Sequence, residues 1–163
     1  FYPHAPGSWW EISDGSIYSI AKSEGGALKA TALVKNTGAD GKITLLHYSC
    51  DQGRLDLVSI GEQDEEGNEI NLQSIAEITE GKCETMTVLP SEADLQKKQT
   101  WMQCETSCRV TASVPLVTDI GTYDALRVDC DNGSVRYYVY GLGLIRTCTI
   151  DGCLEVTDFT LPF

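Results

Sequence analysis

The feature that most restricts how this chain can fold is an internal repeat with an offset of 80 residues. Residues 27–62 align with residues 107–142 without a gap, and nine of the 36 aligned positions are identical. The identical pairs are Thr31/Thr111, Ala32/Ala112, Val34/Val114, Gly41/Gly121, Leu46/Leu126, Cys50/Cys130, Asp51/Asp131, Gly53/Gly133 and Gly61/Gly141. Repetition on this length scale indicates that one supersecondary unit occurs twice, so the chain is expected to build its core from two related units.

Within each copy, apolar residues recur at every second position, which is the spacing of a β-strand with one buried face. The core-facing residues predicted in this way are Leu46, Tyr48 and Cys50 in the first copy and Leu126, Val128 and Cys130 in the second. Each cysteine is followed by an Asp-x-Gly segment, at residues 51–53 and 131–133. Because Asp, Asn and Gly tolerate the backbone angles of tight hairpin turns, each copy is predicted to contain a hairpin with a cysteine at its turn.

The remaining segments complete an all-β prediction. Further hairpin turns are expected at residues 65–68 and 150–152, and a capping pattern that starts at Ser91 predicts one helix from Glu92 to Trp101. The fold class is therefore an antiparallel sandwich or barrel-like structure, built from a degenerate tandem repeat with one short linking helix. The predicted divisions are residues 1–26 (N-terminal arm and first strand), 27–90 (first repeat), 91–106 (linking helix) and 107–163 (second repeat with a C-terminal strand).

Both ends of the chain are rich in aromatic residues. The first ten residues hold two prolines and four aromatic side chains, which favours an extended arm, and Phe159, Leu161 and Phe163 alternate as in a closing strand. Either end is expected to pair with its own chain or with a neighbouring molecule. Exposed Trp and Tyr side chains on a β scaffold suit protein interfaces or sugar stacking. The candidate binding residues are Trp9, Trp10, Tyr137, Tyr138 and Tyr140.

Seven cysteines point to an oxidising compartment, where disulfides form and persist. The sequence begins at Phe1 without an initiator Met, and a removed signal peptide is the expected reason. The disulfide candidates are Cys50, Cys83, Cys104, Cys108, Cys130, Cys148 and Cys153. Cys148 and Cys153 flank a predicted turn and are within reach of each other, whereas Cys104 and Cys108 either pair locally or each pair elsewhere. The odd thiol is either buried or links two subunits.

Two metal sites are alternatives to a protein without cofactors. Cys104, Cys108, Cys148 and Cys153 would form a zinc site, although their spacings differ from the usual C-x2-C pattern. Two acidic turns resemble the start of a calcium loop, but position twelve of the first is Gln73 rather than a glutamate. The calcium candidates are Glu62, Asp64, Glu66 and Gly67 in one turn and Asp129, Asp131 and Gly133 in the other.

Charge and motifs limit the functional classes. With 24 acidic and 12 basic residues the formal net charge is −12, which argues against nucleic acid and anionic membranes as partners. No apolar run approaches the roughly 18–20 residues of a membrane-spanning helix. The two histidines, His4 and His47, form no catalytic pattern, and His47 and Cys50 would point to opposite faces of one strand. No nucleophile elbow, zinc-protease or phosphate-loop motif occurs, and the many acidic residues single out no carboxylate pair.

The cysteine hairpins carry a resemblance to a known family. The segment from Tyr48 to Leu57, YSCDQGRLDL, and its counterpart Cys130-Asp131-Asn132-Gly133 are similar to the strand-turn-strand of periplasmic C-type lysozyme inhibitors. That resemblance implies a small eight-stranded barrel in the periplasm that inhibits lysozyme. The family has one copy of the motif in a shorter domain, and its inhibitory loop has no counterpart that can be placed here.

The sequence favours a non-enzymatic, disulfide-stabilised protein that is secreted, periplasmic or on the cell surface and that acts by binding or assembly. Its partner would be another protein or further copies of the same chain. Two alternatives stay open. The first is an inhibitor of a cationic secreted enzyme such as lysozyme, which the net charge of −12 would attract. The second is a hydrolase that uses carboxylates.

Overall fold

A computed structural model describes residues 5–26, 28–96 and 99–162 and confirms the all-β prediction over these ranges. His4 and Phe163 lie outside the described residues. The strands are β1 (Trp9–Ile12), β2 (Ile17–Gly25), β3 (Lys29–Thr37), β4 (Ile43–Asp51), β5 (Arg54–Gln63), β6 (Glu69–Ser74), β7 (Met86–Leu89), β8 (Thr100–Gln103), β9 (Thr106–Thr118), β10 (Gly121–Cys130), β11 (Val135–Val139), β12 (Gly143–Thr149) and β13 (Gly152–Thr160). The helices are α1 (Ile75–Ile78) and α2 (Glu92–Gln96).

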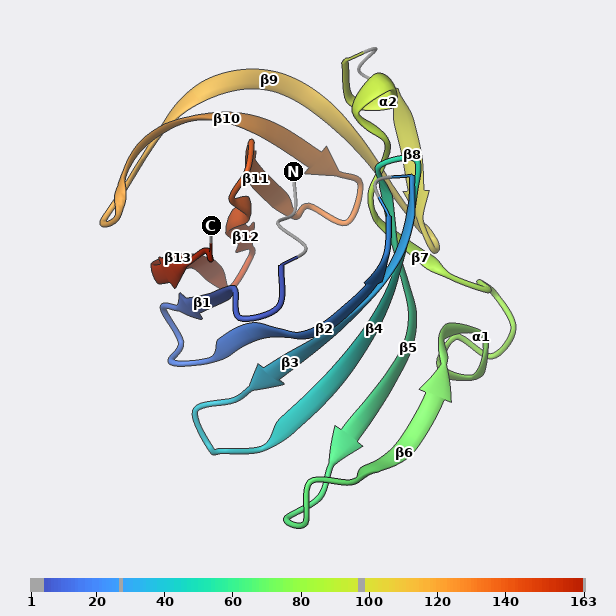
Figure 1. Cartoon of the computed structure of the whole chain (residues 1–163). Helices are drawn as coiled ribbons and strands as arrows, with labels where there is room; N and C mark the ends of the chain where they lie inside the picture. Colours follow the sequence, from blue (N-terminus) through green and yellow to red (C-terminus); the bar gives the residue numbers. More distant parts are fainter. Residues whose placement is uncertain (1–4, 27, 97–98, 163) are drawn as a thin grey trace.

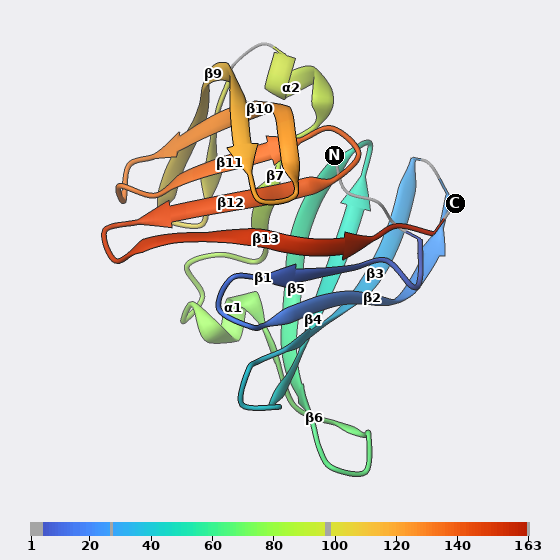
Figure 2. The ribbon, with the colours of Figure 1, turned by 90° about the vertical axis from the view of Figure 1, so that its left-hand side faces the viewer.

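All of these strands belong to one antiparallel sheet, in the order β6-β5-β4-β3-β2-β1-β13-β12-β11-β10-β9-β8, with β7 paired to β5. The end strands of this path, β6 and β8, do not pair with each other in the described part of the chain, so the sheet is not closed. Instead the sheet folds over on itself, with the arc of β9 and β10 opposite β2–β5 (Figure 1). Seen from the side, β10–β13 run across the direction of β3–β5 (Figure 2). The apolar faces of the two halves therefore face a shared interior.

The two copies of the repeat form equivalent three-stranded units. Strands β3, β4 and β5 of the first copy correspond by the 80-residue offset to β9, β10 and β11 of the second. In both copies consecutive strands pair as neighbours, as expected for hairpins. At the first cysteine turn, Gln52 (φ 49°) and Gly53 (φ 82°) both have left-handed backbone angles. That conformation matches the twist of the flanking strands and explains why glycine is suited to the second turn position.

The two halves are joined by the first and last strands. Strand β1 pairs with β2 on one side and with β13 on the other, where Trp9 lies opposite Thr160 and Trp10 opposite Phe159. The described part of the aromatic arm is therefore a central strand that pairs within its own chain. Two apolar clusters pack between the halves. One contains Cys50, Leu55, Leu89, Leu95, Cys108, Val110, Val128, Cys130 and Tyr138; the other contains Trp10, Ile20, Leu116, Ala125, Val139, Ile145 and Val156.

A β-bulge changes which side chains of β10 face the core, so the prediction for Leu126 is wrong. The alternation predicts Leu126 on the buried face of β10, but Ala125 is the buried residue there and Leu126 is only partly buried. The pairing of β10 with β9 shifts register between Arg127 and Val128, and such a shift reverses which positions face inward. Val128 and Cys130, beyond the bulge, are buried as predicted.

The helix prediction is right at its start and wrong at its end. The hydroxyl of Ser91 accepts a hydrogen bond from the backbone of Asp94 (3.3 Å), as a cap does, and α2 then ends at Gln96. Trp101 lies instead in β8, opposite Cys108, where an aromatic ring packs well on a pleated surface. The sequence analysis also missed α1, whose N-cap Ser74 and Glu77 form a complete capping box.

Candidate ligand-binding cavity

A cavity of about 400 Å³ lies between the two halves of the sheet. Its apolar lining consists of Trp10, Ile12, Ile20, Val34, Leu46, Leu57, Val88, Leu142, Leu144, Ile145 and Leu154. Its polar lining consists of Asp14, Ser16, Tyr18, Tyr48, Arg146, Thr147 and Glu155. The first half of the sheet contributes residues from β1–β5 and β7, and the second half contributes residues from β12, β13 and the turn before β12. The size and mainly apolar lining are typical of small-molecule sites.

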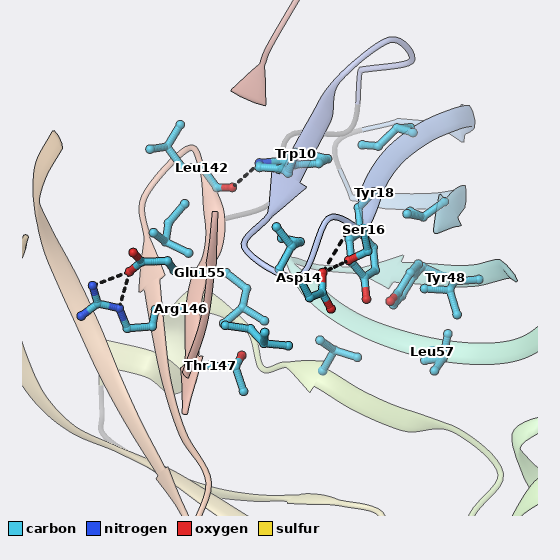
Figure 3. A pocket seen from close by; sticks show the side chains of 18 residues that line it. Trp10, Asp14, Ser16, Tyr18, Tyr48, Leu57, Leu142, Arg146, Thr147 and Glu155 are labelled. Carbon is cyan, nitrogen blue, oxygen red and sulfur yellow. Dashed lines mark hydrogen bonds and ion pairs between the residues drawn. The ribbon is translucent and has the colours of Figure 1, made fainter. Parts of the chain in front are cut away.

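The apolar wall is held in place by the surrounding core. The indole nitrogen of Trp10 donates a hydrogen bond to the carbonyl oxygen of Leu142 (3.1 Å), which joins β1 to the turn before β12 (Figure 3). Ile20 and Ile145 belong to the same apolar cluster as Trp10 and are buried. Leu46, by contrast, is half-buried and lies outside the buried core clusters. Part of the cavity lining therefore belongs to the packed core, while Leu46 lines the cavity without being part of either core cluster.

Two tyrosines bring hydroxyl groups into this apolar space. Tyr18 on β2 and Tyr48 on β4 both line the cavity, and their side chains lie close together there (Figure 3). Among the residues that the structure describes, neither hydroxyl has a hydrogen-bond partner. Burial raises the pKa of Tyr48, and the nearby Tyr18 and Tyr138 raise it further. Burial also raises the pKa of Tyr18, with a smaller contribution from the Asp14 carboxylate. Both hydroxyls therefore remain protonated and able to donate at neutral pH.

Charged groups line the cavity at the turn between β1 and β2 and on β12 and β13. The Asp14 carboxylate accepts hydrogen bonds from the hydroxyl (2.6 Å) and the backbone N–H (2.9 Å) of Ser16. These bonds, the hydroxyl first, lower the pKa of Asp14, so this side chain is negatively charged at neutral pH. The Arg146 guanidinium pairs with the Glu155 carboxylate (Nε to Oε2, 2.8 Å) and also donates to the carbonyl oxygen of Val117 (3.0 Å). Figure 3 shows the Asp14 side chain directed toward Ser16 and the Arg146 guanidinium directed toward Glu155.

The cysteines form three disulfides, which fit the predicted oxidising compartment. Cys148 pairs with Cys153 across the β12–β13 turn, as predicted, while Cys104 pairs with Cys83 and Cys108 pairs with Cys130. Since cytosolic thiols stay reduced, these disulfides identify the protein as extracytoplasmic. They also rule out the zinc site, because all four of its proposed thiolates are oxidised.

Cys50 is the unpaired cysteine, and it is 8% exposed. The repeat explains why it has no partner: Cys50 corresponds to Cys130, whose partner Cys108 corresponds to Leu28. A buried thiol packed in the core agrees with the first of the two roles considered for the odd cysteine. It is not accessible for a bond between subunits unless the core opens.

The acidic turns use their carboxylates within the chain. Asp64 accepts hydrogen bonds from the backbone N–H groups of Glu66 (3.0 Å) and Asn68 (2.8 Å), and Asp129 pairs with the guanidinium of Arg127 (2.8 Å). No group of three or more His, Cys, Asp or Glu side chains within the described ranges is arranged to hold a metal ion. His47 lies on the outer face of β4, where its Nε2 atom is 2.6 Å from the Glu69 carboxylate.

The five candidate aromatic residues are not brought together. Trp10 and Tyr138 are buried at 5% and 1% exposure, and the Tyr138 hydroxyl donates to the carbonyl oxygen of Val88 (3.2 Å). Trp9 and Tyr137 are half-buried, and Tyr140 is exposed. Of the five, Trp10 lines the cavity. Binding of a partner through these rings stays a prediction.

The sequence analysis missed most of the cavity. It placed Tyr48 on the buried face of its strand but drew no conclusion from the hydroxyl on that face. A tyrosine predicted to face a core is a usable signal, because its hydroxyl needs a partner when buried. Asp14, Tyr18, Arg146 and Glu155 gave no such signal, since only the folded sheet brings the two ends of the chain together.

Comparison with known proteins assigns a fold and nothing more specific. No protein-family model matches the chain, and no curated protein matches it. A crystal structure from Bacteroides fragilis NCTC 9343, described as a candidate exported protein with a YmcC-like fold, superimposes with a TM-score of 0.58. The two share 9% sequence identity, and the match covers 99% of each chain. This chain has a YmcC-like fold.

A second structure, a candidate lipoprotein from Parabacteroides distasonis ATCC 8503, has a TM-score of 0.48 and 11% identity over 98% of this chain and 97% of the other. At 9% identity, the likeness to the Bacteroides fragilis structure concerns the fold alone. Within the described residues, no helix has both the length and the apolar character needed to cross a bilayer.

Proposed function

We propose that this extracytoplasmic protein is a non-enzymatic binding protein and that the cavity between the two halves of its sheet is the binding site. The observation that supports this proposal is a mainly apolar hollow of about 400 Å³, partly open to solvent, between the two halves of the sheet. Small-molecule sites are typically concave and mainly apolar, with a few polar groups in the lining. The volume and lining of this hollow are therefore suited to a small ligand.

Two disulfides that restrain the strands around the cavity also support a binding function. The disulfide between Cys108 and Cys130 lies in the core, and that between Cys148 and Cys153 ties β12 to β13. Both β12 and β13 contribute lining residues to the cavity. A preformed site avoids the entropy cost of ordering its walls on binding.

Fluorescence titration with N-phenyl-1-naphthylamine, an uncharged apolar probe, tests this function. We expect saturable binding by the intact protein and at least a tenfold loss of affinity in Leu46→Trp, whose larger ring would occupy the cavity. Leu72→Trp is the matched control, because Leu72 is 53% exposed on β6 and does not line the cavity. Thermal melts would establish that both variants fold. Binding that is absent, or equal in the two variants, would refute the proposal.

A second candidate function is inhibition of a cationic secreted enzyme such as lysozyme. It is supported by the net charge of −12 and by the resemblance of the two cysteine hairpins to C-type lysozyme inhibitors. Opposite charges raise association rates and act most strongly at low ionic strength. A lysozyme assay at low salt, with micromolar protein and no loss of activity, would eliminate this candidate.

A further inference from the structure

The most specific chemistry in the cavity is the pair of tyrosine hydroxyls that face an apolar interior. In mainly apolar ligand sites, a few polar groups such as tyrosine hydroxyls orient the ligand by hydrogen bonding. In the described part of the chain, the hydroxyls of Tyr18 and Tyr48 have no hydrogen-bond partner. Since both stay protonated at neutral pH, each can donate a hydrogen bond to whatever occupies the cavity. The natural complement of two such donors is an acceptor oxygen on the ligand.

The charges around the cavity restrict what kind of oxygen this is. Asp14 lies near Tyr18 and carries a negative charge, while the single guanidinium, that of Arg146, is already paired with Glu155. The lining thus contains two carboxylates, Asp14 and Glu155, and one cation, Arg146. The whole chain carries a net charge of −12. A ligand carboxylate beside the tyrosines would be repelled by Asp14 and would lose hydration in an apolar space. An uncharged oxygen has neither disadvantage.

We infer that the cavity binds a neutral, mainly aliphatic molecule whose uncharged ester or hydroxyl oxygens accept hydrogen bonds from Tyr18 and Tyr48. This inference rests on the proposed binding function and adds its ligand class. The aliphatic part of the ligand packs against Trp10, Leu46 and Leu57. Uncharged acyl esters belong to this class and free fatty acids do not.

Isothermal titration at pH 8 with 1-monolauroylglycerol and with laurate tests the ligand class directly. Both probes carry the same acyl chain, but the first ends in an uncharged ester and the second in a carboxylate. We expect the ester to bind at least tenfold more tightly than laurate to the unmodified protein. Equal affinities, or tighter binding of laurate, would overturn the inference. Because this comparison needs no variant, it does not depend on how any substitution folds.

Tyrosine variants test the role of the hydroxyls. Tyr18→Phe and Tyr48→Phe keep the rings and should each weaken binding of the ester by about threefold to tenfold, the usual effect of one hydrogen bond. Their affinity for N-phenyl-1-naphthylamine, which has no oxygen, should stay unchanged. Tyr123→Phe is the matched control, because the Tyr123 hydroxyl donates to the carbonyl oxygen of Ile120 (2.9 Å) and does not line the cavity.

The outcomes separate the two proposals. If Leu46→Trp blocks all probes while the tyrosine variants bind the ester normally, the cavity is a binding site but the hydroxyls do not select its ligand, and the inference fails. If no probe binds the unmodified protein, the proposed function itself fails. Tighter binding of the ester than of laurate, together with weaker ester binding by both tyrosine variants, would support the inference.

Discussion

Two of the disulfides allow core packing to be separated from loop closure in one experiment. The bonds between Cys83 and Cys104 and between Cys108 and Cys130 close loops of nearly equal length, with sequence separations of 21 and 22. In the chain-entropy model, each bond stabilises the folded state by about 3 kcal/mol through its effect on the unfolded chain. The perturbation is to replace both cysteines of one pair by alanine.

The two pairs differ in burial. Cys108 and Cys130 are 0% and 7% exposed within an apolar cluster, whereas Cys83 and Cys104 are half-buried. Removing two sulfur atoms from the packed core leaves space that its neighbours fill only in part, which costs about 1–2 kcal/mol more. We therefore expect the Cys108→Ala/Cys130→Ala variant to lose about 4–5 kcal/mol and the Cys83→Ala/Cys104→Ala variant about 3 kcal/mol.

Equilibrium unfolding in urea without reductant, followed by circular dichroism, measures both losses. Each variant lacks both cysteines of its pair, so no new thiol is left to exchange with Cys50. Equal losses in the two variants, or a larger loss for the half-buried pair, would refute the conclusion that the buried disulfide contributes through packing.

Three further predictions concern charge and the free thiol. Asp14→Asn keeps an oxygen that can accept hydrogen bonds from Ser16 but removes the negative charge, so titration calorimetry should show severalfold tighter binding of laurate with little change for the neutral ester; unchanged laurate affinity would show that this charge does not select the ligand. The hydrogen bond from Arg127 lowers the pKa of Asp129 from its ordinary value of 3.8, so its contribution to stability is complete above about pH 4 and is lost as the pH falls through the lowered pKa. Urea midpoints should therefore separate the unmodified protein from Asp129→Asn at pH 7 and converge once the pH falls below the lowered pKa, and a constant difference would contradict this pH dependence. Cys50 should react slowly with a thiol reagent in the native state and yield one thiol per chain after unfolding, and rapid native reaction would show that the core around it opens readily.

Local signals in the sequence predicted the strands and turns of both repeats, although the capping box at Ser74 was missed. The 80-residue offset and the period-two alternation predicted strands in both copies, because hairpin partners lie close together in the chain and their turn residues are recognisable. The pairing of Cys148 with Cys153 was predictable for the same reason. The bulge at Arg127 was not, since an extra residue in one strand leaves no clear mark on composition.

The cavity could not be predicted because its residues are distant in sequence. Tyr18 and Arg146 line the same space only because β1 pairs with β13. A one-residue slip in that pairing would turn every side chain of β13 to the other face, and nothing in the local sequence specifies the register. The same difficulty applies to Cys108, whose partner was one of several candidates until the β9–β10 pairing was known.

The position of β13 between β1 and β12 has a consequence for the order of folding. Strands β1–β5 and strands β8–β13 can each form by pairing of segments that are close in sequence. The pairing of Trp10 with Phe159, by contrast, joins residues from nearly opposite ends of the chain. Pairings with such long sequence separation form slowly, because a large loop must close first. If the chain crosses a membrane with its N-terminus first, the β1 edge that pairs with β13 stays unpaired until Phe159 has also crossed. We therefore expect assembly of the finished sheet to be a late, post-translocational event, during which the edge of β1 is open to a chaperone or to the wrong strand.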